Sequence, residues 1–249
     1  LGATSAQADG AAGTLVTDEA TFTFTAETAE QLTKANLTAY KIGDYVQYGS
    51  AYGVVTNNKN AVDSALKAAN VTTAKNQDNL AAALSTGALD ISATRPWNSP
   101  DKTRKFANAL ESENKLTGGT QIIFTAAPTG SDESGYSATV NLPAGIYVFI
   151  DSAAATGSVT KAIPMIVASG TVDTVKKVLT DPTAGATVNM KNTKNSVKTK
   201  TVDKASAAIG DTLTYTLTGT IANPAPTEFK FTDKPGKGLT IQAGTFKFY

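Results

Sequence analysis

Short runs of alternating side chains, separated by glycine and proline, constrain the fold of this chain more than any other feature. Residues 21–25 read TFTFT and residues 136–142 read YSATVNL, so similar side chains recur at every second position. Successive side chains of a β-strand point to opposite faces of a sheet, and a period of two therefore predicts strands. Pro143 and Gly145 mark a tight turn after the second run. Many short strands with this punctuation predict a mainly β, sandwich-like fold.

Further apolar or alternating runs extend the same prediction along the chain. One of them contains Pro164, which has no backbone N–H to donate, so we expect that strand at the edge of its sheet. The additional strands are expected at residues 37–42, 121–125, 146–150, 162–167 and 187–190.

Two stretches follow a helical period instead. In the first, Val62 and Leu66 share one face, and Leu80 and Leu84 do so after a break. We expect helices near residues 60–86, where they interrupt the succession of strands.

The second helical stretch carries a start signal. Ser99 is the expected N-cap, with Pro100 at the first helical position and Asp101 in the first turn. The helix is expected near residues 99–116, and its apolar stripe is formed by Phe106 and Leu110.

The composition excludes several classes of function. The chain contains no histidine and no cysteine among its 249 residues, which excludes disulfides, thiolate nucleophiles, Ser-His-Asp triads and the usual zinc sites. With 22 basic and 21 acidic residues, charge gives no reason to expect nucleic acid as a partner. There is no apolar run long enough for a membrane span. We expect no enzyme activity, cofactor or metal. A carboxylate-based glycosidase is an alternative, but no pair of acids is singled out for it.

The chain divides into three parts. Residues 1–8 resemble the end of a secretory signal peptide, because Ala6 and Ala8 form an A-x-A cleavage pattern; a small-residue terminus is the alternative. Residues 9–192 form a first domain, and residues 196–249 begin a second. Because residues 245–249 have a strand pattern that stops without a turn, we expect a fragment of a longer protein.

The order of several motifs carries a family resemblance. Within the first domain they are residues 37–44 with their AYKIG core, 104–110 (RKFANAL), 142–151 (LPAGIYVFID), 162–167 and 188–192, and in the second 197–204, 209–217 and 231–240. In this order they resemble a sortase-assembled shaft pilin of Gram-positive bacteria. The resemblance implies immunoglobulin-like (Cna-B type) sandwich domains, the first with a helical insertion. It also implies a structural subunit of a covalently assembled pilus, extracellular and anchored to the cell wall.

The resemblance assigns a self-crosslinking pair in the second domain. Lys200 is the lysine expected to bond to an asparagine side chain, and Asp233 is the acid expected to promote the bond. The partner asparagine is expected on a strand after Tyr249. Burial lowers the pKa of a lysine and raises that of a carboxylic acid, so a neutral amine attacks an amide that the acid polarises. The alternatives are a solvated strand lysine and a turn residue ahead of Pro235.

The resemblance also implies a lysine that sortase joins to the next subunit. Lys191 is in the expected place, although Asn189 and Met190 depart from the Tyr-Pro-Lys-Asn context of the family. Lys194 competes with it, and an interdomain linker charge is the alternative role. The implied partners are further copies of the chain, other pilin subunits, a class C sortase and a host surface ligand. A crosslink in the first domain is not expected, because residues 21–25 contain no lysine.

An ancillary pilin or surface adhesin that binds a host glycan or matrix protein is the alternative function. Tyr45, Tyr48, Tyr52 and Trp97 are its candidate residues, since aromatic faces stack on sugars. Packing under loops is the alternative role for these side chains.

Overall fold

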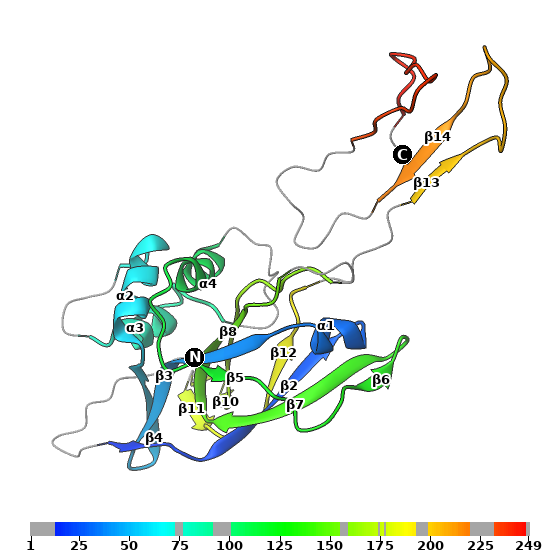
Figure 1. The fold of residues 1–249 in the computed structure, drawn as a ribbon. Helices are drawn as coiled ribbons and strands as arrows, with labels where there is room; N and C mark the ends of the chain where they lie inside the picture. The colour runs from blue at the N-terminus through cyan, green and yellow to red at the C-terminus, as the bar shows by residue number, and fades with distance from the viewer. Residues whose placement is uncertain are drawn as a thin grey trace. The chain divides into compact units, whose positions relative to one another are not determined.

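The computed structural model describes residues 13–72, 77–91, 101–154, 159–173, 175–176, 178–192, 199–219 and 232–247. These residues form two compact units, one ending at residue 192 and the other beginning at residue 199 (Figure 1). The expectations for residues 1–8 and for Trp97 lie outside the described residues. In the described part of the chain, no helix is both long and apolar enough to cross a membrane.

The described part of the first unit contains two main sheets and one small strand pair. The larger one is antiparallel and is organised around β3, which pairs with four other strands. Its strands are β1 (Thr14–Leu15), β3 (Leu37–Tyr48), β4 (Ala51–Thr56), β5 (Thr120–Gln121), β8 (Gly145–Asp151) and β9 (Met165–Ala168).

The second sheet has the order β12-β2-β7-β6. β12 runs parallel to β2, whereas the other neighbours are antiparallel. Its strands are β2 (Glu19–Ala26), β6 (Thr129–Ser131), β7 (Gly135–Pro143) and β12 (Ala186–Asn189), and a separate small pair is formed by β10 (Thr171–Asp173) and β11 (Val178–Asp181).

Aromatic side chains join the two sheets into a sandwich. Phe22 and Phe24, two positions apart on β2, are fully buried. The ring of Phe24 meets Phe149 of β8 edge-on at 5.0 Å, and Phe22 meets Tyr147 in the same way at 5.4 Å. This packing explains the period of two in residues 21–25, since the phenylalanines face the core and the threonines face away. The predicted mainly β sandwich is confirmed.

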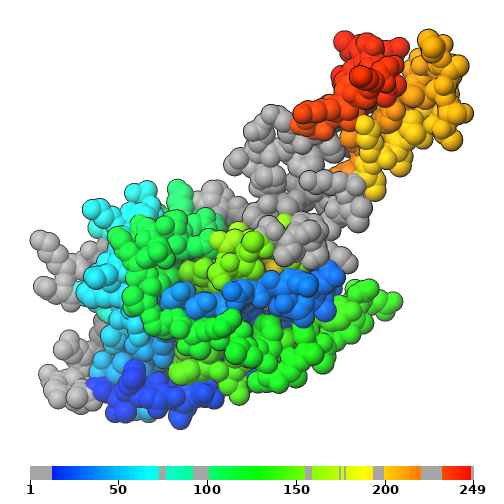
Figure 2. Space-filling model, in the orientation of Figure 1, coloured from blue at the N-terminus to red at the C-terminus, as the bar shows by residue number. Residues whose placement is uncertain are grey.

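The described residues include four helices. α1 (Ala29–Thr33) follows β2, and the helical insertion lies between β4 and β5 as α2 (Lys59–Ala68), α3 (Asn79–Ser85) and α4 (Lys102–Ser112). α2 and α4 pack side by side (Figures 1 and 2). The expected apolar stripe of α4 is buried, with Phe106 and Leu110 at 0% and 1% exposure.

The start of α4 differs from the expectation. Asp101 is the N-cap, because its side chain accepts a hydrogen bond of 2.9 Å from the Arg104 backbone N–H. The helix therefore begins at Lys102, whereas Ser99 had been expected as the cap. Aspartate is as good a cap as serine, and sequence alone did not separate the two. Ser99 and Pro100 lie outside the described residues.

Two expected strands are shorter in the structure. The strand expected at residues 121–125 ends after Gln121, because the chain then crosses between the sheets. Ile122 donates its N–H to Leu37 of one sheet, and Thr125 donates to Thr139 of the other. The strand expected at residues 162–167 begins only at Met165, after Pro164, and it lies at the end of the sheet order as predicted.

The second unit is described through one antiparallel hairpin, β13 (Thr199–Val202) and β14 (Tyr215–Thr218). One face carries only threonine, and the other is mostly apolar. The threonine face consists of Thr199, Thr201, Thr216 and Thr218, and the opposite face of Lys200, Val202, Tyr215 and Leu217. This contrast indicates that the second face is the one suited to burial.

Candidate functional site

The structure brings Lys200 and Asp233 together. The Lys200 ammonium donates a hydrogen bond of 2.6 Å to Asp233 Oδ1, across 33 residues of sequence. The same ammonium lies 4.7 Å from the centroid of the Tyr215 ring, on the apolar face of the hairpin. A carboxylate and an aromatic face therefore both approach one lysine nitrogen.

The burial that was expected around this pair is absent from the described part of the second unit. The side chains of Lys200 and Asp233 are 41% and 32% exposed. Val202 and Leu217 beside them are also exposed, at 41% and 38%. Such a pair is an ordinary partly solvated ion pair, and its chemistry changes only when the apolar face is covered. The reactive roles of Lys200 and Asp233 stay predictions.

Lys191 follows β12 on a tightly held stretch of chain. The Ile163 N–H donates a hydrogen bond of 3.1 Å to the Lys191 carbonyl, and the Met190 N–H donates to Thr25. The next residue, Asn192, is buried at 2% exposure and exchanges hydrogen bonds with Gln31 of α1. The chain on both sides of the lysine is thus fixed to the body of the first unit.

The Lys191 side chain has an unusual electrostatic environment. Its half-buried position lowers its pKa below the usual lysine value, and the charge of Arg104 lowers this pKa further. A lowered pKa increases the fraction of free amine, which is the nucleophilic form. Lys194, the competing lysine, lies outside the described residues. The role of Lys191 in linkage stays a prediction.

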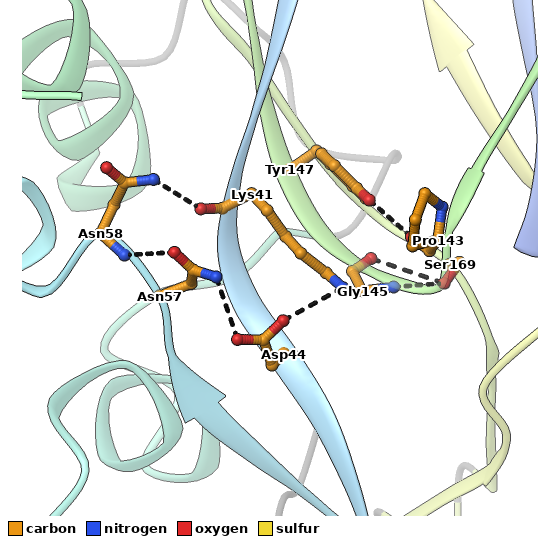
Figure 3. Close-up of polar contacts among 8 residues, drawn as sticks. All are labelled: Lys41, Asp44, Asn57, Asn58, Pro143, Gly145, Tyr147 and Ser169. Carbon is orange, nitrogen blue, oxygen red and sulfur yellow. Dashed lines mark hydrogen bonds and ion pairs between the residues drawn. The ribbon is translucent and has the colours of Figure 1, made fainter. Parts of the chain in front are cut away.

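A lysine, an aspartate and an asparagine also meet in the first unit (Figure 3). The Lys41 ammonium lies 3.1 Å from Asp44 Oδ1, with both side chains about four-fifths buried, at 18% and 21% exposure. The Asn57 side-chain amide donates a hydrogen bond of 3.0 Å to the other oxygen, Asp44 Oδ2. The Lys41 ammonium and the Asn57 amide therefore contact different oxygens of the same carboxyl group. The arrangement is a staple between β3 and the end of β4.

A β-bulge makes the Lys41–Asp44 contact possible. Lys41 pairs with Tyr147 of β8, but Gly43 already pairs with Ile146, so Ile42 is an extra residue in the strand. Lys41 and Asp44, three positions apart, consequently point to the same face, where the ammonium lies 6.0 Å from the Tyr147 ring. Strict alternation would place them on opposite faces, and sequence reasoning therefore missed this site.

Gly145, which pairs with Asp44 in the strand register, lies where a larger residue would not fit. A Cβ atom added to Gly145 would collide with the Lys41 side chain and lie 2.7 Å from the Gly43 carbonyl oxygen. The Gly145 N–H donates to the buried Ser169 hydroxyl at 2.9 Å, which fixes the start of β8 (Figure 3). The end of the Lys41 side chain thus occupies space that a side chain at position 145 would need.

The expected aromatic surface for a sugar is not formed by the described tyrosines. Tyr45 is fully buried, and its hydroxyl donates a hydrogen bond of 2.6 Å to the Ser169 carbonyl. Tyr48 pairs with Ala51 and Tyr52 with Gln47 in the β3–β4 hairpin, so these two rings project from opposite faces. The three side chains cannot stack on one ligand, and this part of the adhesin alternative was wrong.

Metal ligands and a surface depression are further candidates among the described residues. There, no group of three or more acidic, histidine or cysteine side chains could hold a metal ion. A depression is lined by residues of α2, of α3 and of the loop after α2, but its acid, Asp63, already accepts hydrogen bonds from Lys59 and Asn79.

No protein-family model and no curated protein matches this chain. A solved structure with similarity is the T6 backbone pilin of serotype M6 Streptococcus pyogenes, described as a modular three-domain structure decorated with variable loops and extensions. The match covers 82% of this chain with 18% identity and a TM-score of 0.43. This chain spans 36% of that chain's length. Values this low do not assign a family.

Proposed function

We propose that this chain is a structural subunit of a covalently assembled cell-surface pilus, of the shaft type. In this proposal it acts on no external substrate. It is stabilised by a bond between Lys200 and an asparagine, and a class C sortase joins it to further copies and to other pilin subunits on the cell wall.

The observation that carries the proposal is the contact between Lys200 and Asp233. A lysine amine and a carboxyl group within 2.6 Å of each other are two of the three groups that a Lys–Asn crosslink needs. Lys200 lies on the face of the hairpin that is suited to burial, together with Val202 and Tyr215, and Asp233 contacts it there.

Covering this face would remove water from Lys200 and Asp233, which the crosslinking reaction requires. Removing water from an amine and a nearby carboxyl group favours their neutral forms. A neutral amine attacks the side-chain carbonyl carbon of the asparagine, the C–N bond to the amide nitrogen breaks, and ammonia leaves. Because the fold holds the groups in contact, the reaction becomes effectively unimolecular, and a single turnover is sufficient.

Lys191 is the proposed acceptor for the bond between subunits. The support is its fixed backbone, held through Ile163 and through the neighbouring Asn192, together with its lowered pKa. A held lysine with a larger share of free amine suits acyl transfer better than a solvated linker lysine.

The test is the intact mass of the complete gene product, compared with its Lys200→Ala and Asp233→Ala variants. We expect the wild type to be lighter than its sequence mass by one ammonia for each bond. Either variant should regain one ammonia beyond the mass change of its substitution. Lys204→Ala, another lysine of the same unit, is the matched control and should keep the wild-type deficit. A wild type that matches its sequence mass would refute the self-crosslink.

A further inference from the structure

Lys191 and Arg104 are attached to two consecutive residues of one short segment. Ile163 donates its N–H to the Lys191 carbonyl at 3.1 Å, and the next residue, Pro164, accepts a hydrogen bond of 2.7 Å from Arg104 Nη1. The segment leads directly into β9. The chain after β12 and the helix α4 are therefore both hydrogen-bonded to the segment formed by Ile163 and Pro164.

Arg104 is itself well fixed. Its backbone N–H donates to the N-cap Asp101, and its Nη1 also donates to Asn108 Oδ1 at 3.3 Å. Its Nε is buried and has no hydrogen-bond partner in the described residues. Burial lowers the pKa of Arg104, while the charges of Asp101 and Glu111 act to raise it. An arginine stays charged under these conditions, because its usual pKa is above about 12.

Among the described residues, the charged groups near this segment lie on α4, at its N-cap and just before β9. Arg104 and Glu111 belong to α4, Asp101 is its N-cap, and Lys161 precedes β9. The Lys161 ammonium lies 3.0 Å from Glu111 Oε1, so one of the two acids near Arg104 is already engaged by another cation. The charge of Arg104 reaches the Lys191 amine and destabilises its ammonium form, in addition to the effect of burial.

We infer that Arg104 is a positioning residue for Lys191: it anchors the segment that holds the Lys191 backbone and places a positive charge on that segment. This inference rests on the proposed function, in which Lys191 accepts an acyl group. The donor would be a thioester between the incoming subunit and the thiol of sortase. The Lys191 nitrogen forms an amide bond to the acyl carbon while the C–S bond breaks, and the departing thiolate takes the proton that the amine loses.

The test measures the pH dependence of amine reactivity on the complete first unit within the intact chain. A water-soluble acetylating ester is applied between pH 6 and pH 11, and acetylation at each lysine is quantified by peptide mass spectrometry. Acetylation of the exposed Lys67 on α2 is measured in the same samples, so that changes of the reagent itself with pH can be corrected for. Arg104→Met removes the charge and keeps most of the stem, and Arg104→Lys retains a charge at the same position.

We expect Arg104→Met to move the midpoint of Lys191 acetylation to higher pH and to slow its acetylation several-fold near neutral pH. Arg104→Lys should stay close to the wild type. A wild-type curve for Arg104→Met, or equal shifts in both variants, would overturn the inference, because in either outcome the Lys191 amine does not respond to the charge at position 104. Circular dichroism confirms that each variant is folded.

A second assay separates this inference from the proposed function. The complete protein is incubated with sortase and a donor subunit, and the joined product is followed on a gel. If Lys191→Ala is still joined, linkage at Lys191 is refuted, whatever the acetylation curves show. If Lys191→Ala blocks joining but Arg104→Met is joined at the wild-type rate at every pH, the role of Arg104 is refuted and the proposed function stands.

Discussion

Gln31 and Asn192 hydrogen-bond each other in both directions across 161 residues of sequence. The Gln31 side-chain amide donates to the Asn192 carbonyl at 2.6 Å, and the Asn192 side-chain amide donates to the Gln31 carbonyl at 3.1 Å. Both residues are buried, at 5% and 2% exposure. This exchange ties the stretch that carries Lys191 to α1.

Replacing Gln31 should therefore lower the stability of the first unit. Gln31→Ala leaves the buried Asn192 carbonyl without its side-chain donor and the Thr28 N–H without its side-chain acceptor, while the Asn192 amide keeps the Gln31 backbone carbonyl. We expect the free energy of unfolding of the first unit to fall by about 1–3 kcal/mol. Urea denaturation followed by near-ultraviolet circular dichroism measures the change. Gln47→Ala is the control, because the Gln47 amide makes only an exposed hydrogen bond to Gly49, and we expect a change within about 0.5 kcal/mol. Equal losses in the two variants would contradict the prediction.

Among the side chains considered in these predictions, Phe24, which packs between the sheets, should contribute most to the free energy of unfolding. Phe24 is fully buried and meets two rings edge-on, Phe149 at 5.0 Å and Phe124 at 5.4 Å. Phe24→Ala should lower the free energy of unfolding by about 3–5 kcal/mol, through lost burial and a cavity. Ile123→Ala is the control, since Ile123 is 75% exposed and should change stability by less than about 0.5 kcal/mol. A loss below 1 kcal/mol for Phe24→Ala would show that the sheets do not depend on this contact.

The parts of the fold that depend on local pattern were predictable from the sequence. The alternation at residues 21–25 identified a strand whose phenylalanines face the core, and Pro164 identified an edge strand. The helical insertion was visible because Phe106 and Leu110 are four positions apart. These features follow from chain geometry and from neighbours near in sequence.

The parts that depend on distant or irregular contacts were not predictable. The bulge at Ile42 places Lys41 and Asp44 on one face, and no alternation rule reveals an extra residue in a strand. The tyrosine at position 45 resembled a surface aromatic, but its hydroxyl partner is Ser169, 124 residues away. Lys200 and Asp233 were singled out only through the family resemblance, since an isolated lysine and an isolated aspartate carry no positional signal.

Buried tyrosines should make the first unit sensitive to alkali. Burial raises the pKa of Tyr45 above its usual value, an effect that its hydrogen bond to Ser169 only partly opposes. The folded state therefore holds this proton more tightly than the unfolded state. The stability that this provides is fully present below pH 10, the usual tyrosine pKa, and it is lost as pH rises further, by up to about 1.4 kcal/mol per pH unit.

Tyr45→Phe isolates this contribution. At pH 7 the variant should be less stable than the wild type by about 1 kcal/mol, because the Ser169 carbonyl loses its donor. The difference should shrink between pH 10 and pH 11.5, since the variant has no proton to lose at this position. Urea denaturation at several pH values provides the comparison, and Tyr48→Phe on the same hairpin controls for loss of a hydroxyl. A difference that stays constant with pH would contradict the prediction.

The Lys41–Asp44 pair should be energetically coupled more strongly than a surface pair of similar length. Its two side chains are 18% and 21% exposed, whereas those of Lys161 and Glu111, 3.0 Å apart, are 44% and 28% exposed. Lys41→Met or Asp44→Asn alone leaves a largely buried partner without its counter-charge, and each should lower the free energy of unfolding by about 1–3 kcal/mol. The double variant should lose less than the sum, which gives a coupling of about 1 kcal/mol or more in a double-mutant cycle. The same cycle on Lys161 and Glu111 should give less than about 1 kcal/mol and should weaken more in 1 M salt, because solvent and ions screen exposed charges. If both pairs couple equally and respond equally to salt, the staple at the bulge is no stronger than a surface ion pair.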